Sequence, residues 1–101
     1  MTRSLMKPRF SYGRVMLSTS VIVLARAQRL DVLGLLDRHL AGDWGDVSLP
    51  ESQWNDIALV RGGALISRFV ASDLILVILT HQQVQLTKLM LLDEFLENDV
   101  D

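Results

Sequence analysis

The side chains best suited to chemistry lie in one short stretch, residues 36–46, which reads Leu-Asp-Arg-His-Leu-Ala-Gly-Asp-Trp-Gly-Asp. The stretch places the imidazole of His39 near the carboxylates of Asp43 and Asp46. Such a set can bind a divalent metal ion or exchange protons with a substrate. A metal-dependent enzyme built on these three residues is therefore one hypothesis. It requires the three side chains to converge on one open pocket.

The same residues have a structural interpretation, which we favour because their spacing matches no metal-binding loop. His39 lies on the apolar side of an expected helix, where we expect a packed imidazole bonded to a backbone carbonyl. Asp43 and Asp46 are expected to accept hydrogen bonds from backbone N–H groups in a turn. Trp44 either anchors a partner or closes the core, and we favour the core. We predict no catalytic, metal-binding or cofactor-binding residue. The candidates for contact with a protein partner are Arg38, His39, Asp43, Trp44 and Asp46.

Four other side chains carry groups that occur in nucleophilic sites, namely Ser67, Thr80, His81 and Thr87. None of them lies in the sharp strand-to-helix turn that exposes a nucleophile, and none has a visible partner base. The glycine pair at 62–63 follows a helix and lacks the Lys-Ser/Thr of a phosphate-binding loop. We therefore expect no enzyme activity from these residues.

Length and composition limit the class of protein. The chain has 101 residues, enough for one domain, and 50% of them are hydrophobic. That fraction is high for a small domain, so we expect apolar surface that a second copy or another protein covers. The absence of cysteine excludes disulfides, thiol catalysis and cysteine-ligated zinc, and fits a cytoplasmic location. No apolar run reaches the ~20 residues of a membrane span, so we expect no membrane partner.

Charge is distributed unevenly along the chain although the net charge is only −2. Six basic residues precede the first acidic one, and the C-terminal end is acidic. We expect a flexible basic arm at 1–11, a single domain at 12–96 and an acidic tail at 97–101. Aromatic residues alternate with the basic ones of the arm, a pattern that also suits contact with RNA or single strands. The residues of this nucleic-acid alternative are Arg3, Lys7, Arg9 and Arg14.

The periodicity of the apolar residues predicts an α+β fold. A short N-terminal strand at 12–18 precedes helices at 21–27 and 32–41, capped by Thr19 or Ser20 and by Asp31. One uninterrupted helix over 20–41 is the alternative. The segment Ser-Leu-Pro-Glu at 48–51 is a capping box that begins a third helix. Its expected buried stripe consists of Trp54, Ile57 and Ala58.

Three strands follow the helices, at residues 64–70, 74–79 and 86–91. A tight turn at 71–73 and a polar connection at 81–85 join them, which predicts a three-stranded antiparallel meander. The second strand is apolar throughout, as a strand covered on both faces would be. Residues 93–96 are expected to add a helical turn.

The motif at 38–46 resembles one from a family of short bacterial proteins carried largely on plasmids and integrative elements. Some members are labelled plasmid-related proteins and others restriction-endonuclease subunits. The family pattern begins with an Arg-His pair, two variable residues and Gly-Asp-Trp-Gly-Asp. It continues with an Asn and an Ala-Leu pair on a helix, a Gly before the first strand and a Ser near an aromatic residue. A Thr at the end of an apolar strand, a Thr in the last strand and an acidic-aromatic end complete it. This chain matches it at Arg38–His39, Gly42–Asp46, Asn55, Ala58–Leu59, Gly62–Gly63, Ser67, Phe69, Thr80, Thr87 and Asp93–Phe95.

The chain departs from the family after Thr80, where residues 81–84 replace an acidic residue and an Asp-Arg pair. Any family site built on that pair is therefore lost here. The resemblance implies an accessory protein of a mobile element that acts by non-catalytic binding to another protein. Inhibition of a host-defence complex is one form of this hypothesis. Nucleic-acid binding and metal-dependent catalysis are the alternatives.

Overall fold

A computed structural model describes residues 8–98 of the chain as an α+β domain. Its elements in chain order are β1 (Arg14–Leu17), α1 (Thr19–Arg26), α2 (Val32–Leu40), α3 (Leu49–Arg61), β2 (Ala64–Ala71), β3 (Leu74–His81), the 3-10 turn η1 (Gln82–Val84), β4 (Leu86–Leu91) and α4 (Leu92–Asn98). The predicted fold class is confirmed, including the meander and the C-terminal helical turn. None of the helices in this range is long and apolar enough to cross a membrane.

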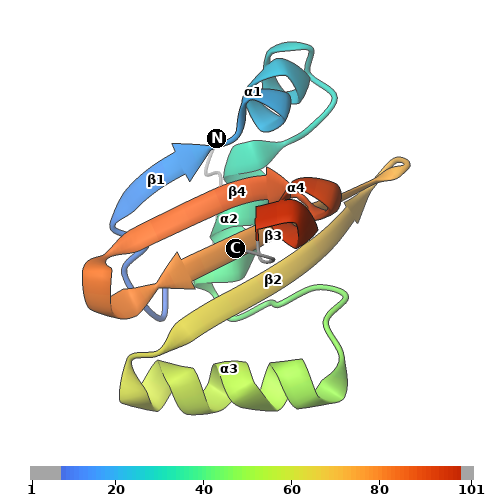
Figure 1. Cartoon of the computed structure of the whole chain (residues 1–101). Coiled ribbons are helices and arrows are strands. Elements are labelled where there is room, and N and C mark those ends of the chain that lie inside the picture. The colour runs from blue at the N-terminus through green and yellow to red at the C-terminus, as the bar shows by residue number, and fades with distance from the viewer. Residues whose placement is uncertain (1–7, 99–101) are drawn as a thin grey trace.

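The four strands form one mixed sheet in the order β1-β4-β3-β2. Strands β2, β3 and β4 pair antiparallel, whereas β1 pairs parallel with β4 at the edge. Strand β4 therefore pairs antiparallel with β3 on one side and parallel with β1 on the other. The short N-terminal strand thus adds a fourth strand to the edge of the meander. In Figure 1, α2 lies behind the sheet and α4 in front of it.

The local signals at the helix starts explain where each helix begins. The side chain of Ser18, one residue before the predicted caps, accepts from the N–H of Val21 and caps α1. Asp31 caps α2 as predicted, so two helices form and not one. The predicted capping box between Ser48 and Glu51 is present at the start of α3. Each cap satisfies a backbone donor that the first helical turn leaves unpaired.

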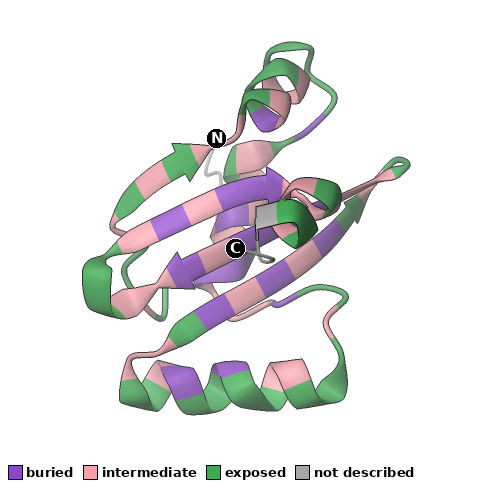
Figure 2. Cartoon of the chain, in the orientation of Figure 1, coloured by how far each residue is buried: buried purple, intermediate pink, exposed green. Residues whose placement is uncertain are grey.

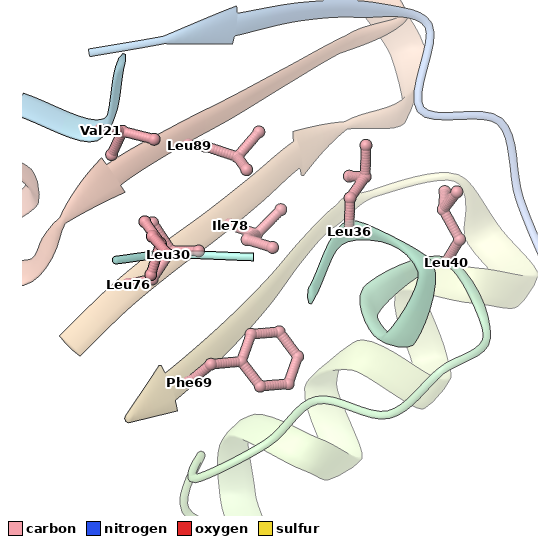
Figure 3. Packing of buried hydrophobic residues seen from close by; sticks show 8 residues of the cluster. All are labelled: Val21, Leu30, Leu36, Leu40, Phe69, Leu76, Ile78 and Leu89. Carbon is pink, nitrogen blue, oxygen red and sulfur yellow. The ribbon is translucent and has the colours of Figure 1, made fainter. Parts of the chain in front are cut away.

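One face of the sheet packs against α1, α2 and the chain before β1. The largest buried cluster joins both helices to β2, β3 and β4, as Figure 3 shows. Its buried members are Val21, Leu30, Leu36, Leu40, Phe69, Leu76, Ile78 and Leu89. On the opposite face, the paired residues Val77 and Met90 are also buried. Strand β3 is therefore covered on both faces, as its continuous apolar sequence predicts.

The outer edge of β2 is closed by two different segments. The amide of Asn55 donates to the carbonyl of Ile66 at 2.7 Å and accepts from its N–H at 3.0 Å. Two residues further along β2, the N–H of Arg68 donates to the carbonyl of Trp44, and the carbonyl of Arg68 accepts from the N–H of Asp46. A sheet edge without partners is prone to pair with other chains. Here α3 and the loop at 42–46 satisfy that edge.

The buried stripe predicted for α3 is confirmed at Ala58 and wrong at Trp54 and Ile57. Trp54 is 69% exposed and Ile57 is also exposed, while Asn55 and Ala58 face the protein. The helix contacts the edge of β2 and not a sheet face, as Figure 1 shows. The polar Asn55 makes the edge hydrogen bonds, so the arc that contains it turns inward. The apolar arc turns to solvent as a consequence.

We predict that Gly45→Ala destabilises the fold by about 3 kcal/mol, measured by urea unfolding. Gly45 has a φ of 72°, and an added Cβ would lie 2.2 Å from the carbonyl oxygen of Arg68. Gly62→Ala is the matched control, because Gly62 also has a positive φ but open space at its Cβ position. The control should cost only about 1–2 kcal/mol, the strain of the left-handed conformation alone. Equal losses in the two variants would contradict the close approach of loop and strand.

Candidate functional site, a buried histidine network

The most unusual chemical feature of the molecule is an imidazole placed wholly inside it. His39 lies on α2, and its exposed fraction is 0%. Its Nδ1 lies 2.6 Å from the hydroxyl of Ser67 on β2, and its Nε2 lies 2.9 Å from that of Thr80 on β3. The prediction of a packed histidine is confirmed. The predicted backbone carbonyl partner is wrong, because two hydroxyl groups from the sheet take that place.

The hydrogen bonds continue from the imidazole to the segment before β1. Thr80 Oγ1 lies 2.7 Å from Thr87 Oγ1, and the Thr87 hydroxyl donates to the carbonyl of Tyr12 at 2.6 Å. All four side chains of this chain of bonds are fully buried, and no buried side-chain polar atom in the described residues lacks a partner. Buried networks stabilise a fold only when every member is satisfied. This one therefore links α2, three strands and the N-terminal segment.

The direction of each proton follows from the carbonyl at the end of the chain. A carbonyl only accepts, so Thr87 must donate to Tyr12 and accept from Thr80. Since Thr80 has one proton and gives it to Thr87, the Nε2 of His39 must carry the proton that Thr80 accepts. Burial lowers the pKa of His39 to about 3, so the ring is neutral at pH 7. The Nδ1 atom is then bare and accepts from Ser67.

Aromatic rings close the network on its remaining side. Phe10 lies edge-on to the His39 ring with 5.2 Å between centroids, and Trp44 lies edge-on to it at 5.6 Å. The two aromatic rings also stack on each other. Phe10 is held there because the N–H of Arg9 donates to the carbonyl of Leu40. Residues 9–12 thus lie against the network.

Ser67 and His39 form the hydroxyl–imidazole pair that sequence reasoning did not find. The two residues are 28 positions apart, and no local pattern joins them. The alternation of β2 was the available signal, since it places Ser67 between the inward-facing Leu65 and Phe69. A nucleophile must reach its substrate, whereas both partners here have no exposed surface. The geometry therefore favours a structural role for the pair.

The carboxylates of the motif lie elsewhere. Asp43 pairs with Arg38 Nε at 2.6 Å and accepts from the N–H of Gly45, which confirms its predicted turn bond. The Arg38 side chain lowers the pKa of Asp43, and the Gly45 N–H adds to that effect. Asp46 contributes its backbone N–H to Arg68. Within residues 8–98, no group of three or more His, Asp or Glu side chains is placed to hold a metal ion.

The other candidates for contact with a partner also make internal contacts. Trp44 is only 6% exposed and packs with Ala58 and Leu65, so its core interpretation is confirmed. The Arg38 guanidinium lies over the ring of Phe69 at 4.6 Å. The described contacts of Trp44 in the loop at 42–46, and those of Arg38 before it, are therefore made within the fold.

The nucleic-acid candidates are only partly described. Arg3 and Lys7 lie outside the described residues. Arg9 and Arg14 are exposed, and the Arg9 side chain lies close to Gly42.

Comparisons of the chain with protein-family models, with curated proteins and with solved structures found no match.

We predict that the stability of the fold decreases as the pH falls from about 6.5 towards 3. An imidazole in the unfolded chain binds a proton near pH 6.5, whereas the folded pKa of His39 is about 3. The unfolded state therefore binds the extra proton in this window, and the free energy of unfolding drops by up to ~1.4 kcal/mol per pH unit. Urea unfolding at pH 6.5 and pH 5 measures the slope above the range where carboxylates titrate. His39→Gln should remove most of it, and an unchanged slope would contradict the buried neutral ring.

We also predict that His39 is the Nε2–H tautomer at neutral pH. Nitrogen-15 NMR of the imidazole should show a protonated Nε2 and a bare Nδ1. Thr87→Val removes the acceptor of the Thr80 proton, so in this variant Thr80 can donate to Nε2 and the preference should weaken. A protonated Nδ1 in the unmodified chain would refute the derived direction of the hydrogen bonds.

Proposed function

We propose that this chain acts by non-catalytic protein–protein binding, as a cytoplasmic accessory protein of a mobile genetic element. The binding surface in this proposal is the exposed apolar face of α3. One observation supports it above the others: the helix turns large apolar side chains to solvent while its polar Asn55 faces the sheet edge. Figure 2 shows α3 as mostly exposed. We call the residues Leu49, Trp54, Ile57 and Val60 the α3 stripe.

The α3 stripe has the composition of a binding surface. Trp54 is a large ring with a polar N–H, and tryptophan is enriched among residues that dominate binding energy. Val60 is 88% exposed, and Ile57 lies between it and Trp54 along the helix. Contiguous apolar surface on a small protein is typical of an interaction site. The internal contacts of Trp44 and Arg38 leave α3 as the stronger candidate surface.

The resemblance to plasmid and integrative-element proteins supports the mobile-element part of the proposal. The class of partner that it suggests is a component of host defence or of plasmid maintenance, which the chain would inhibit or modulate.

A photo-reactive amino acid placed on the α3 stripe tests the proposal. We expect benzoyl-phenylalanine at position 57 to give a discrete cross-linked product in bacterial cells, because this position lies inside the proposed interface. Leu33 on α2, also exposed, is the matched control position and should give none. The mass of the product shows whether the partner is another protein or a second copy. Identical cross-linking from positions 57 and 33 would contradict a specific role for α3.

A further inference from the structure

The two edges of the sheet differ in how their backbone groups are satisfied. Strand β2 is closed by α3 and the loop at 42–46, whereas β1 is the outermost strand on the other side, as Figure 1 shows. The N–H groups of Arg14 and Ser18 donate to the neighbouring β4 side of the sheet. Backbone groups of alternate residues point to opposite sides of a strand, so those of Val15 and Leu17 point away from β4. Within residues 8–98, no group pairs with them.

A second β1 can pair with these free groups in one antiparallel register. Hydrogen-bonded residues of an antiparallel ladder exchange both of their N–H···O bonds. With Val15 opposite Leu17 of the other copy, all of the outward N–H and carbonyl groups of both copies are used. A shift by two residues would instead bring Gly13, whose φ is 64°, or the helical Thr19 into the ladder. The two-fold axis of the favoured register therefore passes through Met16.

The same register brings opposite charges together on the outer face of the sheet. Arg14 lies opposite Ser18 of the other copy, and both side chains are on the same face because side chains alternate along a strand. The Ser18 hydroxyl donates to Glu94 Oε1 at 2.7 Å. Arg14 is exposed and forms no ion pair with a described residue. Pairing thus places each Arg14 guanidinium beside the Glu94 carboxylate of the second copy.

A cavity beside β1 can receive that guanidinium. Its volume is about 220 Å³, and Met16, Lys88 and Glu94 are among the residues that line it. Glu94 Oε1 already accepts from the Ser18 hydroxyl and the Leu91 N–H. A carboxylate has about four acceptor positions, so it can bind a guanidinium as well. Lys88 forms no ion pair with a described residue, so it repels the incoming charge and provides a control of opposite sign.

We infer that two copies of this chain join their sheets through β1, antiparallel about Met16, with Arg14 of each copy bound to Glu94 of the other. The pairs of Val15 with Leu17 extend the apolar cluster of the inner face, and the two half-exposed Met16 side chains cover each other. The inference is independent of the α3 stripe, which lies at the opposite edge of the sheet. Since β1 has only 4 residues, the interface is small and the dimer should be reversible.

Sedimentation equilibrium of the full chain from micromolar to millimolar concentration tests the inference. Proline at position 15 removes only the outward N–H and spares the bonds between β1 and β4. We expect a monomer–dimer equilibrium that Val15→Pro weakens about tenfold or more, because each copy loses a hydrogen bond to the other. Val15→Ala keeps the N–H and should weaken the dimer less. Circular dichroism checks the fold of both variants. A chain that stays monomeric at millimolar concentration, or a dimer indifferent to Val15→Pro, overturns the inference.

A cysteine at position 16 tests the register without disturbing the backbone. The chain has no cysteine of its own. Residues opposite each other in a non-hydrogen-bonded antiparallel pair have Cα atoms about 4.5 Å apart, within the range of a disulfide. Met16→Cys should therefore form an intermolecular disulfide under mild oxidation, measured by non-reducing electrophoresis. Arg14→Cys is the matched control on the same face and should form little, because position 14 faces position 18. Equal yields from the two variants overturn the register.

Charge variants test the contact between Arg14 and Glu94. Arg14→Gln should weaken the dimer several-fold, because the symmetric pair loses this ion pair twice. Lys88→Gln should leave the dimer unchanged or tighter, since it removes a cation of the same cavity that has no partner. Equal weakening by both variants overturns the ion pair. A monomeric chain whose position 57 still cross-links to another protein rejects this inference and supports the proposed function.

Discussion

The fold depends on satisfying one imidazole that has no access to water. His39 is bonded on both sides by hydroxyls of the sheet, and the chain of bonds ends on a backbone carbonyl before β1. An unpaired polar group at such a site would cost about 1–3 kcal/mol. To keep both hydrogen bonds of His39, helix α2 must hold one rotation about its own axis and one distance from the sheet. The same constraint draws the N-terminal segment into the core, where Phe10 and Trp44 cover the ring.

The Gly-Asp-Trp-Gly-Asp motif acts together with that imidazole. Trp44 packs on His39 from one side, while its carbonyl and the N–H of Asp46 hold the edge of β2. Gly45 permits the approach because a side chain there would collide with the strand. His39 and Ser67, which the sequence pattern singles out together with the motif, thus hold elements of this fold in place. Their roles here concern architecture, and the surface that we propose for recognition is on α3.

Local sequence signals predicted the helix caps correctly. They could not predict the hydrogen bonds between residues far apart in the sequence. The caps at Asp31 and Ser48 depend on neighbours three residues away, so the sequence shows them directly. The bonds of His39 cross 28 and 41 residues, and periodicity carries no information about which hydroxyl meets which nitrogen. The error at Trp54 has a similar cause. Helical periodicity identifies an apolar arc, but the hydrogen bonds of Asn55 to β2 decide which arc turns inward.

Fluorine NMR of the chain labelled with 5-fluorotryptophan tests the central claim most directly, because its two tryptophans give one signal each. The claim is that Trp44 belongs to the buried architecture and that Trp54 lies on the exposed face of α3. We expect the Trp44 signal to be insensitive to solvent isotope. The Trp54 signal, assigned with Trp54→Phe, should respond to it. A Trp54 signal that is insensitive to solvent isotope, or a Trp44 signal that responds to it, would contradict the claim.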